Sequence, residues 1–141
     1  MPLNIYIKRL MQYAFDNGIS CVLTDKMNEF TPSSAKPDNK IILVNLNWHK
    51  QAEIIFQMAH EIGHVVNKDE GILYYSSFSN KAGYERNANL KALDILVPIY
   101  VEVMGEDSIN NIFPFMEAFC IPERLEEDVR AVFHKTLAPM Y

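Results

Sequence analysis

Residues 56–70, FQMAHEIGHVVNKDE, carry apolar and chemically reactive side chains within the same few helical turns. The apolar residues recur at helical spacing and predict one buried face: Phe56, Ala59, Ile62, Val65 and Val66. His60, Glu61 and His64 lie in the same turns, and such groups are costly to place against a core unless a partner satisfies them. The stretch therefore predicts an amphipathic helix that runs from Trp48 or His49 to about residue 67. Its polar side chains need a binding partner, either structural or chemical.

The polar residues form an HExxH motif, which is typical of a zinc site. On a helix, positions i and i+4 stack on one face, so His60 and His64 can both bind one Zn²⁺ at about 2.0–2.1 Å. Glu61 is rotated by roughly 100° from His60 and lies beside the metal, where it suits a general base that activates a metal-bound water. Because the motif fixes only three positions, two incidental histidines remain the alternative, and a third ligand decides between them.

A second predicted helix offers a candidate for that third ligand. Glu85 lies 21 residues after His64, which is enough chain for a loop and a return to an adjacent helix. Ala88 and Ala92 put small residues on the Glu85 face, so two helices can approach closely there. Asn89, at i+4, can hydrogen-bond the outer nitrogen of a metal-bound histidine. The plainer alternatives are an exposed carboxylate at a helix start for Glu85 and a surface or capping role for Asn89.

A peptidase also needs a donor for the developing oxyanion, and several residues offer one. The available side chains are Tyr74, Tyr75, Tyr84 and His134. Tyr75 is the preferred candidate because it lies between the two predicted metal-binding helices. Residues of these types are more often packing or surface residues than catalytic ones, so the sequence alone does not choose among the four.

The remaining segments predict a mostly helical α+β fold. Further helices are expected at residues 3–16, 82–97, 100–104, 108–119 and 122–135, with the second of these stopped near Pro98. Strands are expected at 20–24 and 40–45, separated by a turn-rich loop at 25–39. The two strands can pair into a small sheet beside the HExxH helix. The 141 residues fit a single domain, 1–141.

Composition narrows the class of function. The formal charge is −5 and the sequence pI is about 5.3, which argues against a nucleic-acid-binding surface and favours a protein partner. Cys21 and Cys120 lie far apart and outside any CxxC pair, as expected for reduced thiols. The N-terminal residues contain no continuous apolar signal-peptide core, and no apolar run approaches membrane-spanning length. We therefore expect a cytoplasmic protein without a membrane partner.

The linked motifs resemble the ImmA/IrrE family of HExxH metallopeptidases, found in phage, integrative elements and bacterial stress systems. Phe56 and Ala59 precede His60 as in the family's F-x-x-A-H-E-x-G-H. The downstream residues follow its E-x-x-A-N-x-x-A-x-x-L-L-x-P pattern at Glu85, Ala88, Asn89, Ala92, Ile95, Leu96 and Pro98. Asn45, which ends the strand before the motif, also matches the family. Residues 119–122 match it more weakly, at a point where the family often turns into a final helix. The resemblance covers about residues 40–130 and departs at Lys91, where the family often has an aromatic residue.

The resemblance implies a small gluzincin-like domain with His60, His64 and Glu85 as ligands of one Zn²⁺ and Glu61 as the base. It also implies site-specific cleavage of a helix-turn-helix transcriptional repressor, which relieves repression of mobile-element or stress genes.

Two other functions remain open at the level of sequence. One is a non-proteolytic, metal-containing anti-repressor that binds and sequesters a repressor. The other is a structural zinc domain, which usually needs four protein ligands.

Two imidazoles and a carboxylate suit zinc best, although manganese or iron is possible. The oligomeric state is left open.

Overall fold

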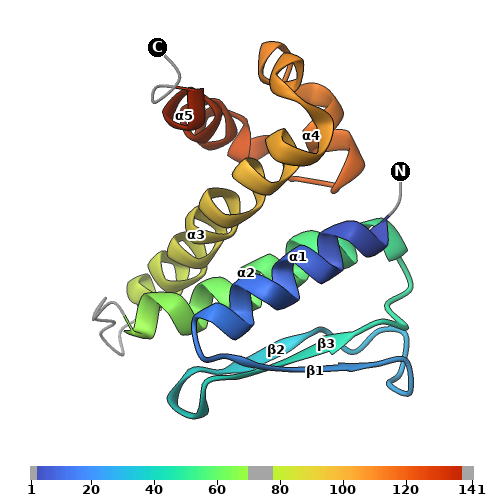
Figure 1. Ribbon diagram of the computed structural model, residues 1–141. Coiled ribbons are helices and arrows are strands. Elements are labelled where there is room, and N and C mark those ends of the chain that lie inside the picture. The colour runs from blue at the N-terminus through green and yellow to red at the C-terminus, as the bar shows by residue number, and fades with distance from the viewer. Residues whose placement is uncertain (1–2, 70–77, 138–141) are drawn as a thin grey trace.

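The computed structural model describes residues 3–69 and 78–137, which form a mostly helical α+β fold, as predicted (Figure 1). The strands are β1 (Ser20–Thr24), β2 (Ser34–Lys36) and β3 (Ile41–Asn45). The helices are α1 (Leu3–Asp16), α2 (Ile54–Asp69), α3 (Phe78–Met104), α4 (Phe113–Ala118) and α5 (Glu126–Leu137). Short 3-10 turns precede α2, α4 and α5. No helix in the described ranges is long and apolar enough to cross a membrane.

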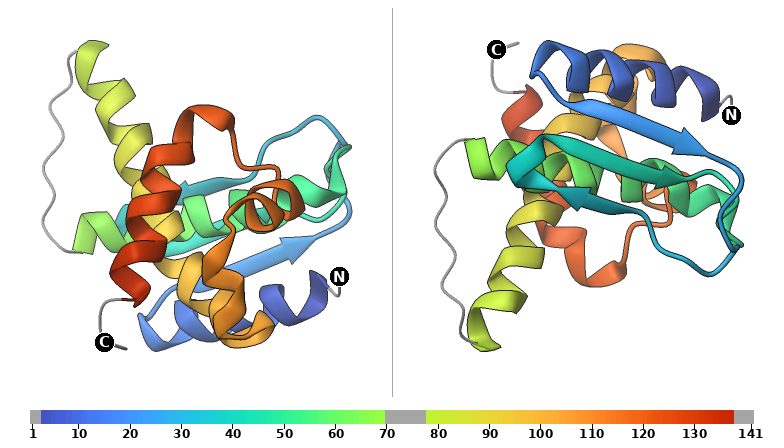
Figure 2. Two further views of the ribbon diagram at one scale, coloured as in Figure 1. Left: turned by 90° about the horizontal axis from the view of Figure 1, so that it is seen from above. Right: turned by 90° about the horizontal axis from the view of Figure 1, so that it is seen from below.

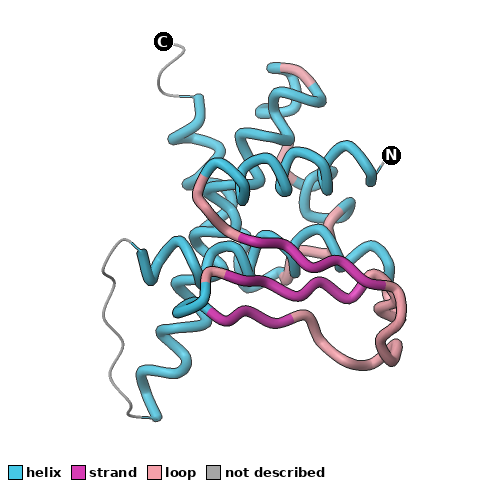
Figure 3. The backbone as a smooth tube through the Cα atoms, turned by 60° about the horizontal axis from the view of Figure 1, so that its bottom comes forward, coloured by secondary structure: helices cyan, strands magenta, loops and turns pink. Residues whose placement is uncertain are grey.

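The three strands form one mixed sheet in the order β1-β3-β2 (Figure 3). β1 and β3 are parallel, from Ser20 opposite Ile41 to Thr24 opposite Asn45, which confirms the predicted pairing. β2 runs antiparallel to β3. β2 was not predicted, because it is only three residues long and lies in a stretch rich in proline and serine, which indicates turns.

The sheet, a pair of helices and a second group of helices lie in successive layers (Figures 1 and 2). α1 and α2 cover one face of the sheet, toward which the fully buried Ile42 and Val44 of β3 point. α3 packs on α2, and α5 packs on α3. The aromatic rings of Tyr6, Tyr100, Phe115, Phe119 and Phe133 join α1 to the C-terminal helices, mostly by edge-to-face contacts. This core fixes α2 and α3, the two helices that carry the motifs.

Asn45, at the end of β3, holds the loop that precedes the sheet's second strand. Its side chain is fully buried and donates from Nδ2 to the carbonyl oxygens of Asn28 and Thr31, at 2.9 and 2.7 Å. Its Oδ1 accepts the backbone N–H of Asn47 at 2.8 Å. Asn45 therefore has a structural role in this chain, since its side chain fixes the path of this loop.

The expectation that Pro98 ends a helix is wrong, because α3 continues through it to Met104. Proline removes one helical hydrogen bond and costs about 3 kcal/mol in a helix interior. The neighbouring side chains are buried on both sides of the proline, and their burial outweighs that cost: Leu96, Val97, Ile99, Tyr100 and Val101. The predicted helix at 108–119 is likewise divided into a 3-10 turn, Glu106–Asn110, and α4.

Candidate metal centre

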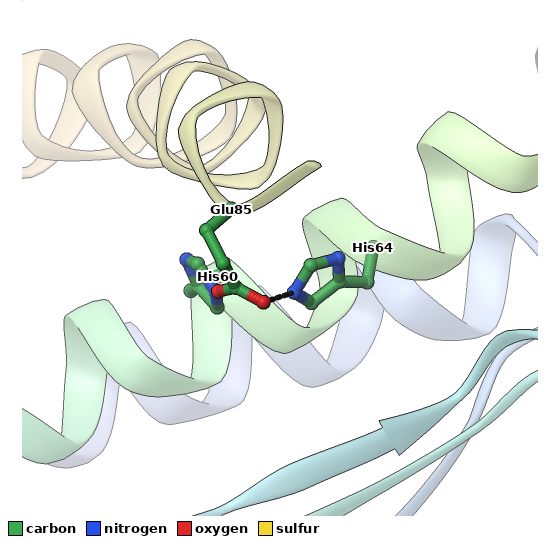
Figure 4. A group of neighbouring side chains, drawn as sticks. All are labelled: His60, His64 and Glu85. Carbon is green, nitrogen blue, oxygen red and sulfur yellow. Dashed lines mark hydrogen bonds and ion pairs between the residues drawn. The ribbon is translucent and has the colours of Figure 1, made fainter. Parts of the chain in front are cut away.

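α2 and α3 bring the two histidines and Glu85 together (Figure 4). His60 and His64 project from one face of α2, with ring centroids 4.7 Å apart and an interplanar angle of 89°. Glu85 reaches them from α3, with Oε2 lying 2.8 Å from His60 Nε2 and Oε1 lying 3.3 Å from His64 Nε2. One ligand atom from each residue lies within 4.8 Å of the others. The three side chains that the two motifs predict as ligands therefore converge on one point.

Asn89 sets the hydrogen-bonding state of His60. The Nδ1–H of His60 donates to Asn89 Oδ1 at 2.7 Å, the contact that the i+4 spacing from Glu85 predicts. In a neutral ring this leaves a lone pair on Nε2, directed at a carboxylate oxygen only 2.8 Å away. Two electron-pair donors at that distance repel each other unless a cation lies between them or the ring is protonated. The arrangement therefore fits a divalent cation held by Nε2 and Glu85.

His64 is almost fully buried, with 6% of its side chain exposed. Burial, and then the neighbouring His60, lower its pKa and favour the neutral imidazole, which is the form that binds metals. Its Nδ1 is buried and has no hydrogen-bond partner within the described part of the chain. The ring instead stacks on Tyr84 of α3, with centroids 4.2 Å apart and an interplanar angle of 26°. Ring packing against Tyr84 and His60 therefore holds the orientation of His64.

Gly63 allows α3 to lie close enough for Glu85 to reach the histidines. A Cβ at Gly63 would lie 2.8 Å from the Ala88 carbonyl oxygen, which is closer than Cβ atoms normally come. Ala88 and Ala92 are fully buried, which confirms the small-residue face predicted for α3. The motif itself assigns no role to Gly63. Only the crossing of the two helices shows that a side chain there would push α3 away.

Glu61, the predicted base, lies in the turn between the two histidines. Burial raises the pKa of its carboxyl to about 8, and the negative charge of Glu85 contributes to the rise. A carboxyl with a pKa near neutrality can accept and return a proton under ordinary conditions. Its environment is thus compatible with general acid–base chemistry.

The candidate oxyanion donors fall in different places. Tyr75, like Tyr74, lies outside the described residues, so its role stays a prediction. Tyr84 is at the site, against His64, and His134 lies exposed on α5. Tyr84 thus contacts a candidate ligand, which its position in the sequence did not reveal.

This chain belongs to a family of peptidases, the IrrE N-terminal-like domain family (Peptidase_M78), whose model matches residues 18–99. Peptidases of this family depend on a metal, and the His60–His64–Glu85 group is placed to hold one. The match includes both motif-bearing segments and ends before α4 and α5. No curated protein and no solved structure matches the chain.

Proposed function

We propose that the protein is a zinc-dependent endopeptidase. The observation that carries this proposal is the approach of His60 Nε2 and His64 Nε2 to the two oxygens of Glu85, at 2.8 and 3.3 Å. Hydrogen bonding to Asn89 already occupies the other nitrogen of His60. A site with three protein ligands of this kind leaves a coordination position for a reactant, whereas structural zinc sites usually use four protein ligands.

Each residue has a distinct task in this proposal. His60, His64 and Glu85 would hold the cation, and two imidazoles with a carboxylate suit zinc. When bound, zinc supplies a Lewis acid that acidifies water and polarises a carbonyl. Glu61 would accept a proton from the water that attacks the scissile carbonyl and return it to the leaving amine. Asn89 and Tyr84 would keep the two imidazoles in place.

We further propose a helix-turn-helix repressor as the protein substrate. The resemblance to the ImmA/IrrE family supports this choice. The net charge of −5 also supports it, because DNA-binding proteins are usually basic and opposite charges steer association.

A Glu61→Gln variant tests the chemistry separately from metal binding. Purified wild-type protein is expected to contain about one zinc by elemental analysis and to cleave a repressor encoded beside its gene at a defined bond. Glu61→Gln should retain the metal and lose at least about 100-fold in cleavage rate, since general base catalysis contributes about 10²–10⁴-fold.

The matched control is Glu106→Gln, the same substitution at an exposed position in the 3-10 turn before α4, and it should cleave normally. Undiminished cleavage by Glu61→Gln contradicts the proposal. Loss of repressor–DNA binding in proportion to added protein, equal for wild type and Glu61→Gln and without fragments, would instead indicate sequestration.

A further inference from the structure

The turn of α3 that carries Glu85 has little apolar anchoring of its own. The neighbouring residues are exposed, namely Lys81, Ala82, Gly83 and Arg86, and 48% of the Glu85 side chain is exposed. Ala88 is the first buried residue in the described part of this helix. The beginning of α3 extends away from the other helices in Figure 2. Contacts besides the core packing that begins at Ala88 must therefore help to hold Glu85 opposite the histidines.

The residues on either side of Glu85 are tied to two different helices. Tyr84 stacks on His64 of α2. Arg86 forms a two-pronged ion pair with Asp128 of α5, in which Nη1 donates to Oδ2 at 3.2 Å and Nη2 donates to Oδ1 at 2.9 Å. A bidentate guanidinium–carboxylate pair fixes direction as well as distance. The backbone that carries Glu85 is thus held from both sides.

α5 is a suitable anchor for this pair. Only 20% of the Asp128 side chain is exposed, so solvent screens the pair less than it screens a fully exposed one. The next residue, Val129, is fully buried, and Val132 and Phe133 fix the same helix in the core. Asp128 therefore has a well-defined position from which to hold Arg86.

We propose that Arg86 and Asp128 are positioning residues for the metal centre, so that α5 is part of that centre without touching the metal. The inference rests on the proposed function, because it presupposes that Glu85 is a metal ligand. Arg86 lies within residues 18–99, which the family model matches, whereas Asp128 of α5 lies beyond them, so one partner of the ion pair comes from outside the matched residues.

A second ion pair between the same two helices provides the control. Lys135 Nζ of α5 lies 3.3 Å from Asp94 Oδ1 of α3. Asp94 is nine residues beyond Glu85, about two and a half turns further along the helix. Breaking this pair removes a contact between α3 and α5 and leaves the turn with Glu85 untouched.

The experiment is a cobalt titration of the metal-free full-length protein, followed by the visible absorption of bound Co²⁺. Asp128→Asn and Arg86→Gln should each weaken cobalt binding by about tenfold, the lower end of the effect of residues that orient metal ligands, and change the absorption band. Asp94→Asn should bind as wild type does. The exchange R86D/D128R should restore much of the affinity, and Arg86→Lys, which keeps the charge without the two-pronged geometry, should be intermediate.

The outcomes separate this inference from the proposal that it rests on. Wild-type affinity and an unchanged band in both Asp128→Asn and Arg86→Gln would overturn the positioning role while leaving the metal centre intact. An equal loss in Asp94→Asn would also overturn it, because any contact between α3 and α5 would then suffice. Wild-type protein that fails to bind cobalt or zinc would overturn the metal centre itself, and the positioning role with it.

Discussion

The contact between Asn89 and His60 shows how one side chain can define a ligand. Asn89 is only 8% exposed and accepts the Nδ1–H of His60 at 2.7 Å, which leaves Nε2 free for a metal. Asn89→Ala should therefore weaken zinc binding by about 10- to 100-fold, measured by competition with a chromogenic chelator. Asn87→Ala on the same helix is the control and should bind zinc normally. Equal affinities in the two variants would contradict the orienting role of Asn89.

The ionised form of Glu61 destabilises the fold, because its carboxylate is buried and lies near the negative charge of Glu85. Its pKa is about 8 in the fold, well above the ordinary 4.5, so the folded state binds more protons than the unfolded state between these values. This contribution to the free energy of unfolding is fully present below pH 4.5 and is lost as the pH rises toward 8. Glutamine cannot ionise and lacks this dependence.

In the metal-free protein, Glu61→Gln should therefore become more stable than wild type as the pH rises from 5 to 8, by more than about 1 kcal/mol at the upper end. Urea unfolding in the presence of a chelator measures the difference at each pH. Comparing the two proteins removes the contribution of other titrating groups, including His64, whose lowered pKa acts in the opposite direction. A difference that does not change with pH would show that Glu61 is not buried as described.

At the scale of elements, the crossing of α2 and α3 depends on Gly63. Gly63→Ala places a Cβ 2.8 Å from the Ala88 carbonyl oxygen, so α3 must shift and carry Glu85 with it. We expect a loss of about 1–3 kcal/mol in the free energy of unfolding, typical of overpacking, together with at least tenfold weaker zinc binding.

The matched control is Gly83→Ala, in a helical position of α3 where a Cβ meets nothing within 4 Å. Because alanine is the better helix former by about 1 kcal/mol, this variant should be as stable as wild type or more so. Chemical denaturation and zinc titration of both variants provide the comparison. Wild-type behaviour of Gly63→Ala would mean that the two helices are less tightly packed than described.

The same elements show why some features were predictable and others were not. The span of α1, the positions of the two strands that pair and the convergence of the two motifs depend on local patterns: hydrophobic period, turn residues and i, i+4 spacing. The passage of α3 through Pro98 depends on burial supplied by other helices, which no local pattern reports. The pair of Arg86 with Asp128 joins residues 42 positions apart and appears only when α5 is placed against α3.

At the scale of the whole molecule, the candidate metal centre lies between layers rather than within one. α2 is attached to the sheet and α1, whereas Glu85 belongs to α3 and is held from α5. Occupancy of the site is therefore expected to stabilise the contact between these two parts of the fold. A ligand that binds only the folded state adds about 2.7 kcal/mol when its free concentration is 100 times its dissociation constant.

Removing zinc should accordingly lower the thermal midpoint of wild-type protein by several degrees, measured by circular dichroism with and without a chelator. Glu85→Gln should show little of this zinc-dependent stabilisation, because an amide is a weaker ligand than a carboxylate. Glu102→Gln, near the other end of the same helix, should keep the full response, since its carboxylate pairs with Arg9. An equal zinc response in Glu85→Gln and wild type would place the metal elsewhere and remove Glu85 from the ligand set. The difference in zinc-dependent stabilisation between Glu85→Gln and Glu102→Gln therefore measures how much the bound metal stabilises the contact between α2 and α3.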